Sequence, residues 1–358
     1  MLKKIRPYIC LLILFLGFWW RDKFAWASVE VWDIYTKDYS DNIQNTDIWW
    51  ELLISPYNVE EHLIDIFSEA KYTIDFWLYQ FSYNKMQQLF LNLLTSGRQI
   101  RWISEDRPYW WENSTYEKFA SKFERDGWEV RSDWDLKLGT NFNHTKTFLI
   151  DWTIAVISTA NITYSSMFRN REYRFVTSDV SIVENITYLF NKDWNQKSIN
   201  KNDIHDALLV CPIDCRDKIE KQINEATQSI SIQAQYLEDD RIVWLLILAV
   251  ARWVDVSVMV SSNQKKESLQ WLLDIESQED FTQWWVNIMI VPKDTEKLPY
   301  IHAKNMLVDG DTLIMWSMNF STNGLDNNRE IWILTTNLDI ISNYTRQWER
   351  DIESYTEI

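Results

Sequence analysis

The chain is an internal duplication, and this feature constrains its fold more than any other. The segment LLISPYNVEE from Leu52 matches LLVCPIDCRD from Leu208 at an offset of 156 residues. HTKTFLID from His144 and HAKNMLVD from His302 match at an offset of 158 residues. In each half, helical patterns are followed by alternating, β-rich segments. We therefore expect an α/β fold of two similar lobes related by an approximate twofold axis, with the connection in residues 195–207.

Length and composition indicate a globular protein. The 358 residues are 46% hydrophobic, enough to bury two lobes of about 150 residues each. The formal net charge is −16, which disfavours non-specific attraction to nucleic acid or anionic lipid. Any anionic substrate must therefore be held by local cations.

The N-terminus predicts a secretory signal over residues 1–27. A basic start precedes an apolar run over residues 8–18, which is short for a membrane span, and an A-x-A cleavage site follows at 25–27. We expect an exported protein, whether periplasmic, in the cell envelope or secreted. The alternative is an uncleaved membrane anchor, because the tryptophans at 19–20 lengthen the run. The apolar run 242–251 is too short to span a membrane and predicts a buried helix.

Cleavage of the signal would leave two cysteines, Cys211 and Cys215. Export permits a disulfide between them, and the alternative is a pair of small, half-buried thiols. Two cysteines without a nearby histidine pair do not make a zinc site. We expect no metal and no cofactor.

The same polar residues follow one histidine in each half, at offsets of 2, 7, 17 and 28. They are His144, Lys146, Asp151, Asn161 and Glu172 in the first half, and His302, Lys304, Asp309, Asn319 and Glu330 in the second. A duplicated core could keep its spacing for packing alone. It would not readily keep residues of these types, which are costly to bury. These two sets are therefore the candidate site.

The spacing of histidine and lysine also has a chemical meaning. Residues two apart on a strand project from the same face, so each H-x-K sequence places an imidazole beside an ammonium. Two apposed lobes would gather two of each in one site. Such a cluster suits a phosphodiester, because lysines and asparagine amides hold non-bridging oxygens while imidazoles carry out attack and proton transfer. For the remaining histidines, His62 and His205, we expect structural roles.

These residues resemble the signature of the phospholipase D superfamily, H-x-K-x4-D-x6-G-S-x-N in two copies, over essentially the whole chain after the signal. The resemblance implies two phospholipase D-type α/β lobes, with sheets flanked by helices and the active site at their interface. We place the N-terminal lobe at 28–200 and the C-terminal lobe at 201–358. The resemblance also implies a two-step, metal-independent displacement through a phosphohistidine.

The resemblance assigns roles to single residues. It implies that His144 is the nucleophile and His302 the general acid, although the reverse assignment is chemically equivalent. Glu172 and Glu330 would orient the motif histidines and support their imidazolium forms. The phosphate-binding set would be Lys146, Lys304, Asn161, Asn319, Thr159 and Ser317, while Asp151 and Asp309 would secure the turn after each strand.

The leading functional hypothesis is an exported phospholipase D-like phosphodiesterase that cleaves or transfers phosphatidyl groups. One alternative is a cardiolipin synthase-type phosphatidyltransferase, which has the same active site and a different acceptor. Another is a secreted nuclease of the same superfamily, which the net charge disfavours. The non-enzymatic alternative is an inactive binding module. We expect a phospholipid or other phosphodiester substrate, transient contact with a membrane surface, and a monomer.

Glycine and tryptophan usage is unusual, with six glycines and 22 tryptophans. Average glycine usage of about 7% would give about 25 glycines in a chain of this length. Across the duplication, Gly97 aligns with Trp253, Gly127 with Trp285, and Gly310 with Trp152. We hypothesise that many of these tryptophans are glycines, encoded by UGA in a genome that reads UGA as glycine. The alternative, a tryptophan-rich surface for carbohydrate or membrane, does not explain the alignment.

Trp316 is the most consequential of these tryptophans. It occupies the position of the signature glycine in the second copy, and Ser158 occupies the same position in the first copy. We expect the residue before Ser317 to end a strand beneath the phosphate site, where the backbone comes close to substrate or to the facing lobe. An indole there would have to fill that space or push the lobes apart.

Overall fold

The computed structural model describes residues 48–106, 108, 120–276, 286–292 and 298–357. The predicted signal over residues 1–27 and Trp285 lie outside these ranges. Residues 48–358 form one compact unit, which contains both halves of the duplication. Within the described ranges, no helix has the length and apolar character needed to cross a membrane.

The first half forms a sheet in the order β1-β7-β6-β5-β2-β3-β4. Its strands are β1 (Trp50–Ser55), β2 (Thr73–Leu78), β3 (Gln99–Ser104), β4 (Glu129–Ser132), β5 (Lys146–Ile150), β6 (Ile154–Ser158) and β7 (Asn170–Thr177). Its helices are α2 (Val59–Ser68), α3 (Asn84–Thr95), α5 (Asp133–Leu136), α6 (Tyr164–Phe168) and α7 (Val180–Trp194). Strands β2, β3 and β4 run parallel, whereas β5 is antiparallel to both of its neighbours.

The second half repeats this topology, with the sheet order β11-β10-β9-β13-β14-β15-β8. Its strands are β8 (Leu208–Cys211), β9 (Ser229–Ala234), β10 (Asp255–Ser261), β11 (Val286–Val291), β13 (Lys304–Val308), β14 (Thr312–Met315) and β15 (Glu330–Thr335). Its helices are α8 (Cys215–Glu225), α9 (Asp240–Ala251), α10 (Lys266–Glu276), α11 (Thr322–Asp326) and α12 (Leu338–Thr356). The predicted fold class, two similar α/β lobes, is confirmed.

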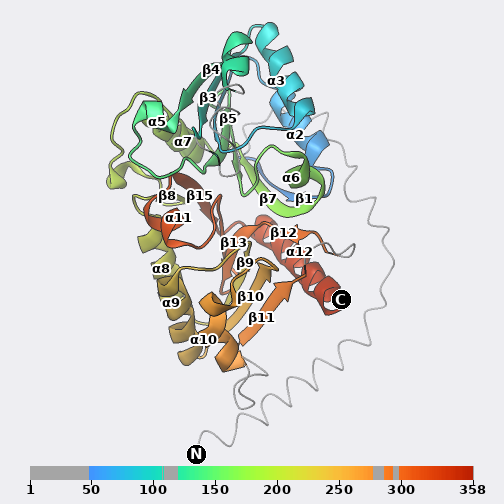
Figure 1. The fold of residues 1–358 in the computed structure, drawn as a ribbon, viewed down its shortest axis with the longest axis vertical. Helices are drawn as coiled ribbons and strands as arrows, with labels where there is room; N and C mark the ends of the chain where they lie inside the picture. Colours follow the sequence, from blue (N-terminus) through green and yellow to red (C-terminus); the bar gives the residue numbers. More distant parts are fainter. Residues whose placement is uncertain (1–47, 107, 109–119, 277–285, 293–297, 358) are drawn as a thin grey trace, which may run out of the picture. The chain divides into compact units, whose positions relative to one another are not determined.

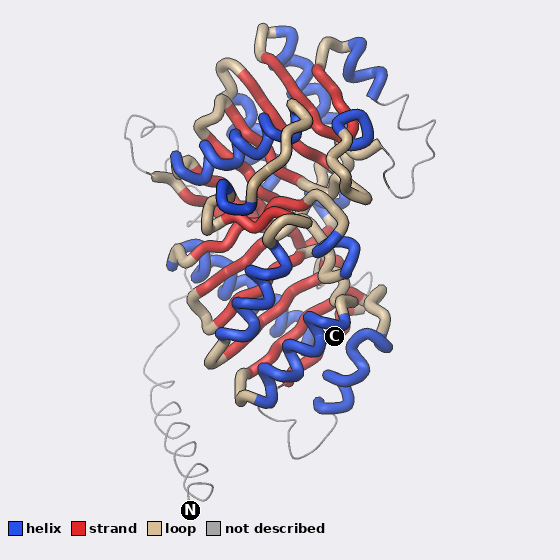
Figure 2. Tube along the Cα trace, turned by 90° about the vertical axis from the view of Figure 1, so that its left-hand side faces the viewer, coloured by secondary structure: helices blue, strands red, loops and turns tan. Residues whose placement is uncertain are grey.

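Helices cover the sheets of both lobes (Figures 1 and 2). The central strands β2, β5 and β13 are buried along their whole length, including their polar residues, which the sequence pattern alone did not indicate. Helix α9 contains the apolar run 242–251 and packs one face into the core, as predicted. The predicted lobe boundary at residue 200 falls between α7 and β8, beside the short 3-10 helix η3 (Lys201–Asp203).

A core cluster shared by both halves joins the lobes. It includes Tyr173 and Phe190 from the first half and Ile331 and Tyr344 from the second. Each lobe also has its own outer core beneath its helices. Backbone pairing crosses between the lobes as well, because the short strand β12 (Tyr300–Ile301) pairs in parallel with β7. The two lobes are therefore joined by a continuous hydrophobic core and by backbone hydrogen bonds.

The backbone supports the glycine hypothesis at two of the aligned positions. Trp152 has φ 56° and Trp253 has φ 71°, and the aligned glycines Gly310 and Gly97 have φ 74° and 93°. Trp253 ends α9 as Gly97 ends α3. In each case the backbone N–H of the following residue, Val254 or Arg98, donates to a carbonyl in the last turn of the helix, Ala249 or Leu93, as is typical of a helix end with a left-handed residue. A side chain with a Cβ disfavours this conformation by about 1–2 kcal/mol.

Trp316 follows β14 but does not separate the lobes. Its side chain is fully buried in the outer core of the second lobe, stacked on Trp332 at a ring separation of 4.9 Å and edge-on to Phe320 at 4.4 Å. The indole fills space in the core of its own lobe, not the expected space against substrate or the facing lobe. Neither indole nitrogen of the stacked pair has a hydrogen-bond partner among the described residues. Each such buried N–H costs about 1–3 kcal/mol.

We predict that Trp253→Gly raises the free energy of unfolding by about 1 kcal/mol, because glycine adopts the left-handed conformation without strain. Trp244→Gly is the matched control, since both side chains are 55% exposed and Trp244 lies inside α9. There glycine lowers the free energy of unfolding by about 1 kcal/mol. Urea denaturation of both variants measures the two values. Loss of stability in both would contradict the glycine hypothesis at position 253.

Candidate active site

The two H-x-K sequences lie at the start of equivalent strands. Lys146 is the first residue of β5 and Lys304 the first of β13, so each histidine stands just before its strand. The backbone N–H of His144 donates to the carbonyl of Arg329 at 3.0 Å, and that of His302 donates to Arg171 at 3.2 Å. Each histidine is therefore anchored to the other lobe by its main chain.

The imidazoles are also held across the lobes. His144 Nδ1 lies 3.1 Å from Glu330 Oε1, and His302 Nδ1 lies 2.6 Å from Glu172 Oε1. Both carboxylates are fully buried, while both histidine side chains are 20% exposed. The sequence predicted that these glutamates orient the histidines without indicating which pairs with which. The structure pairs each histidine with the glutamate of the opposite lobe.

The carboxylates favour one tautomer of both histidines, and at His302 the Glu172 oxygen at 2.6 Å is closer to Nδ1 than Lys304 Nζ, which lies 3.1 Å from the same atom. A carboxylate can only accept, so Nδ1 carries the proton and Nε2 keeps its lone pair. Burial, reinforced by the charge of Lys146, lowers the pKa of His144 to about 4 against the opposing effect of Glu330. Burial also lowers the pKa of His302, although Glu172 opposes the shift. Both imidazoles are therefore neutral at pH 7 in the free protein, and each can act as a nucleophile.

The two lysines are fully buried between the lobes. Lys146 Nζ donates to the carbonyl of His144 at 2.7 Å and to that of Ser317, from the other lobe, at 3.3 Å. Lys304 Nζ donates to the carbonyl of His302. Burial lowers the pKa of Lys146 to about 7 and that of Lys304 to about 8. An anion bound beside them would favour the charged forms of both.

The motif hydroxyls contact the orienting carboxylates. Thr159 Oγ1 donates to Glu172 Oε2 at 2.7 Å, and Ser317 Oγ donates to Glu330 Oε2. Each glutamate is thus fixed through both of its oxygens, one to a histidine of the opposite lobe and one to a hydroxyl of its own lobe. The hydroxyls of Thr159 and Ser317, which the resemblance assigned to phosphate binding, donate to these carboxylates in the structure.

Of the remaining motif residues, the two aspartates have equivalent contacts in the two lobes and the two asparagines do not. Asn319 Oδ1 is buried without a hydrogen-bond partner among the described residues. Asn161 Oδ1 accepts the backbone N–H of Gln80 at 3.2 Å, so its amide nitrogen is the remaining donor of that side chain. The aspartates accept backbone N–H groups: Asp151 from Lys71, Tyr72 and Thr73 at 2.7–2.8 Å, and Asp309 from Thr227, Gln228 and Ser229 at 2.7–3.1 Å. These bonds tie the turn after β5 or β13 to the start of β2 or β9.

The structure adds two residues near His144 that the motif did not identify. The Tyr79 ring meets the His144 ring edge-on at 4.7 Å, with Lys146 Nζ 5.5 Å from the tyrosine ring centre. Glu105 Oε2 accepts the backbone N–H of Asn143, the residue before His144, at 2.7 Å. The duplication gave no signal for either residue, because the aligned positions hold a glutamine and a serine.

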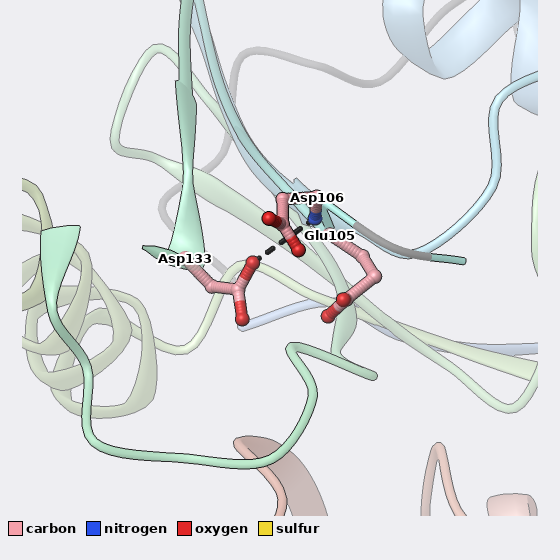
Figure 3. A group of neighbouring side chains, drawn as sticks. All are labelled: Glu105, Asp106 and Asp133. Atoms are coloured by element: carbon pink, nitrogen blue, oxygen red, sulfur yellow. Dashed lines mark hydrogen bonds between the residues drawn. The ribbon is translucent and has the colours of Figure 1, made fainter. Parts of the chain in front are cut away.

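Glu105 belongs to a group of three carboxylates with Asp106 and Asp133, whose oxygens lie within 4.8 Å of one another (Figure 3). Asp133 accepts the backbone N–H of Asp106 at 3.0 Å, and burial raises the pKa of Asp133 to about 6. The backbone bonds of Glu105 and Asp133 explain their positions without an ion. The chemistry of the histidines and lysines uses none of the three.

Two segments of the chain, residues 63–194 and 219–352, match the family model described as the phospholipase D-like domain of cardiolipin synthase. Together they span well over half of the chain, and each contains one H-x-K motif. The chain therefore belongs to the phospholipase D-like family, as the sequence predicted.

Two curated relatives are both named phospholipase D. The protein of Rickettsia conorii is 25% identical over 158 residues, which cover 44% of this chain and 73% of the relative. The protein of Rickettsia prowazekii is 25% identical over 138 residues, which cover 38% of this chain and 62% of the relative.

Two solved structures share the fold. Phosphatidylserine synthase of Haemophilus influenzae superposes with a TM-score of 0.66 at 11% identity, covering 86% of this chain and 88% of the other. Polyphosphate kinase of Porphyromonas gingivalis superposes with a TM-score of 0.63 at 15% identity, covering 83% of this chain and 49% of the other. At these identities the likeness establishes the fold alone.

We predict a bell-shaped pH profile of kcat/KM for bis(4-nitrophenyl) phosphate, whose good leaving group needs no general acid. The rate should rise through about pH 4, as His144 loses its proton and becomes a nucleophile. It should fall from about pH 7 to about pH 8, as Lys146 and Lys304 lose the charges that hold the anion. A rate that continues to increase between pH 7 and 9 would show that the cationic lysines are not required.

Proposed function

We propose that the protein is an exported phosphodiesterase that cleaves or transfers phosphatidyl groups through a phosphohistidine. The observation that carries this proposal is the pair of crossed histidine–glutamate contacts beside two buried lysines. Two imidazoles, each with an available Nε2, provide one nucleophile and one proton carrier. The lysines provide the local positive charge that a protein with net charge −16 needs to hold an anion.

The reaction follows from these groups. Nε2 of His144 attacks phosphorus, the bond from phosphorus to the leaving oxygen breaks, and protonated His302 gives its Nε2 proton to that oxygen. The phosphodiester anion beside His302 favours this protonated form. In the second step His302 takes a proton from water or an alcohol, whose oxygen displaces His144 from phosphorus. Histidine in this second role acts as a general base.

Three observations support a lipid substrate and export. The curated relatives are named phospholipase D, and the family model is that of cardiolipin synthase. The acidic net charge disfavours nucleic acid. The Cys211–Cys215 disulfide, one of the two states that the sequence allowed, suits an oxidising compartment. We propose transient contact with a membrane surface and a monomeric protein.

A phosphatidyltransferase is the second candidate. The superposition covers 88% of a solved structure that is named phosphatidylserine synthase. The same phosphohistidine would serve both reactions. The acceptor decides between them, so the test must supply one.

The proposed function is tested by incubating residues 28–358 with a mixed phospholipid extract, with glycerol present or absent, and separately with plasmid DNA. We expect release of lipid head groups in buffer containing EDTA, because the mechanism uses imidazoles and lysines and no metal ion. New phosphatidylglycerol in the glycerol sample would identify transfer. Nicked plasmid with intact lipid would assign the nuclease activity instead, and recovery of activity only on adding a divalent ion would refute the metal-independent mechanism.

The histidine roles predict different kinetic defects. His144→Ala should abolish labelled phosphoenzyme with every substrate. His302→Ala should still form it from a 4-nitrophenyl diester but react about 100-fold more slowly or worse with alkyl leaving groups, which need a proton. His62→Ala is the control, because His62 pairs with Glu51 outside the site and should leave both rates unchanged. Labelled phosphate on His302 in the unmodified protein would reverse the assignment.

A further inference from the structure

Two buried ion pairs connect the lobes directly behind the active site. Arg171 Nε lies 2.9 Å from Asp351 Oδ2, and Arg171 Nη2 lies 2.8 Å from Oδ1 of the same carboxylate. Arg329 Nη2 lies 3.0 Å from Asp193 Oδ1. All four side chains are at least nine-tenths buried. Each pair joins an arginine of one lobe to an aspartate on the last long helix of the other.

The two pairs are related by the duplication. The arginines are 158 residues apart, as are the aspartates, which is the offset of the H-x-K motifs. Each arginine makes a further bond within its own lobe, because Nη1 of Arg171 donates to the carbonyl of Ser55 and Nη1 of Arg329 donates to that of Cys211 at 3.3 Å. Ser55 and Cys211 end the equivalent strands β1 and β8. Each guanidinium therefore fixes its own sheet edge and the opposite lobe together.

Each arginine is bonded into the site in two ways. Arg171 precedes Glu172, which holds His302, and the Arg171 carbonyl accepts the His302 backbone N–H. Arg329 stands in the same relation to Glu330 and His144. Neighbouring side chains on an extended segment point to opposite faces, so each ion pair holds its segment from the face opposite to the glutamate.

Stability alone does not account for these charges. A buried ion pair contributes little net stability compared with apolar packing of the same volume, because desolvation offsets the attraction. An ion pair that fixes the position of one lobe relative to the other can instead contribute to the reaction rate. A displacement of about 1 Å at a reacting group can cost about 100-fold in rate.

We propose that Arg171–Asp351 is the positioning pair for His302 and that Arg329–Asp193 is the positioning pair for His144. These residues do not touch substrate and act through the glutamate and the carbonyl that hold each histidine. The kinetic consequence rests on the proposed function, in which His302 gives a proton and His144 attacks phosphorus. Each pair then governs a different half of the reaction.

The test uses Asp351→Asn and Asp193→Asn, which remove one charge and keep the side-chain shape. The matched control is Asp75→Asn, because Asp75 is also fully buried and pairs with Arg101 at 2.7 Å within the first lobe. Arg171→Lys and Arg329→Lys provide milder versions that keep the charge but lose the forked geometry. These lysine variants replace the aspartate variants in the same measurements if an aspartate variant fails to fold.

The first readout needs no activity. Nitrogen NMR of histidine-labelled protein should show the Nδ1–H tautomer at both histidines of the unmodified protein. Asp351→Asn should disturb that tautomer at His302 only, and Asp193→Asn at His144 only, while Asp75→Asn leaves both unchanged. This result would stand even if the protein cleaved no phospholipid, so the two proposals can fail separately.

The second readout is the leaving-group dependence. Asp351→Asn should slow alkyl diesters about 10–100-fold and leave phosphoenzyme formation from a 4-nitrophenyl diester near its original rate. Asp193→Asn should slow phosphoenzyme formation about 10–100-fold with the alkyl diesters and with the 4-nitrophenyl diester. A smaller loss of rate in Arg171→Lys than in Asp351→Asn, and in Arg329→Lys than in Asp193→Asn, would support positioning. The proposal would be overturned if Asp351→Asn and Asp193→Asn only lowered the thermal stability. In that case their histidine tautomers and leaving-group dependence would match those of Asp75→Asn.

Discussion

The candidate site depends on the contact between each motif imidazole and a buried carboxylate of the opposite lobe. A histidine Nδ1 that must meet Glu330 or Glu172 within 2.6–3.1 Å leaves the lobes little freedom to move. The shared core, the pairing of β12 with β7 and the cross-lobe arginines all meet this requirement. The candidate active site therefore lies at the interface of the lobes, and neither half of the duplication contains all of its contacts.

Burial gives the site its chemical character. It keeps the imidazoles neutral and brings the lysine pKa values down to about 7 and about 8, so the free site holds less positive charge than its residues suggest. A phosphodiester anion supplies the missing partner, and its arrival favours the charged lysines and a protonated His302. The surroundings of the two histidines differ, because the Tyr79 ring meets His144 edge-on at 4.7 Å, whereas the Tyr300 ring lies tilted and 6.4 Å from His302. This asymmetry gives two similar halves a physical basis for two different roles.

Much of the fold and the site could be predicted from sequence, because the duplication supplied an internal comparison. It identified the lobes, the motif residues and the glycine-like positions at Trp152 and Trp253, whose φ values agree. The crossed pairing could not be predicted, since a glutamate 28 residues after its histidine has the same spacing whether it contacts that histidine or the other one. The arginine–aspartate pairs shared the 158-residue offset and were missed because the resemblance gave them no role. The backbone at Trp316 was expected to come close to substrate or to the facing lobe, whereas the indole packs in the core of its own lobe against Trp332.

The most direct test of the composite site is a crystal structure of the protein with vanadate, which mimics the phosphorus centre during displacement. The account predicts vanadium bonded to Nε2 of His144, with His302 Nε2 on the opposite side and both Lys146 and Lys304 contacting its oxygens. Each imidazole should still bond the glutamate of the other lobe. Vanadate held by the residues of one lobe alone, or histidines paired with glutamates of their own lobe, would contradict it.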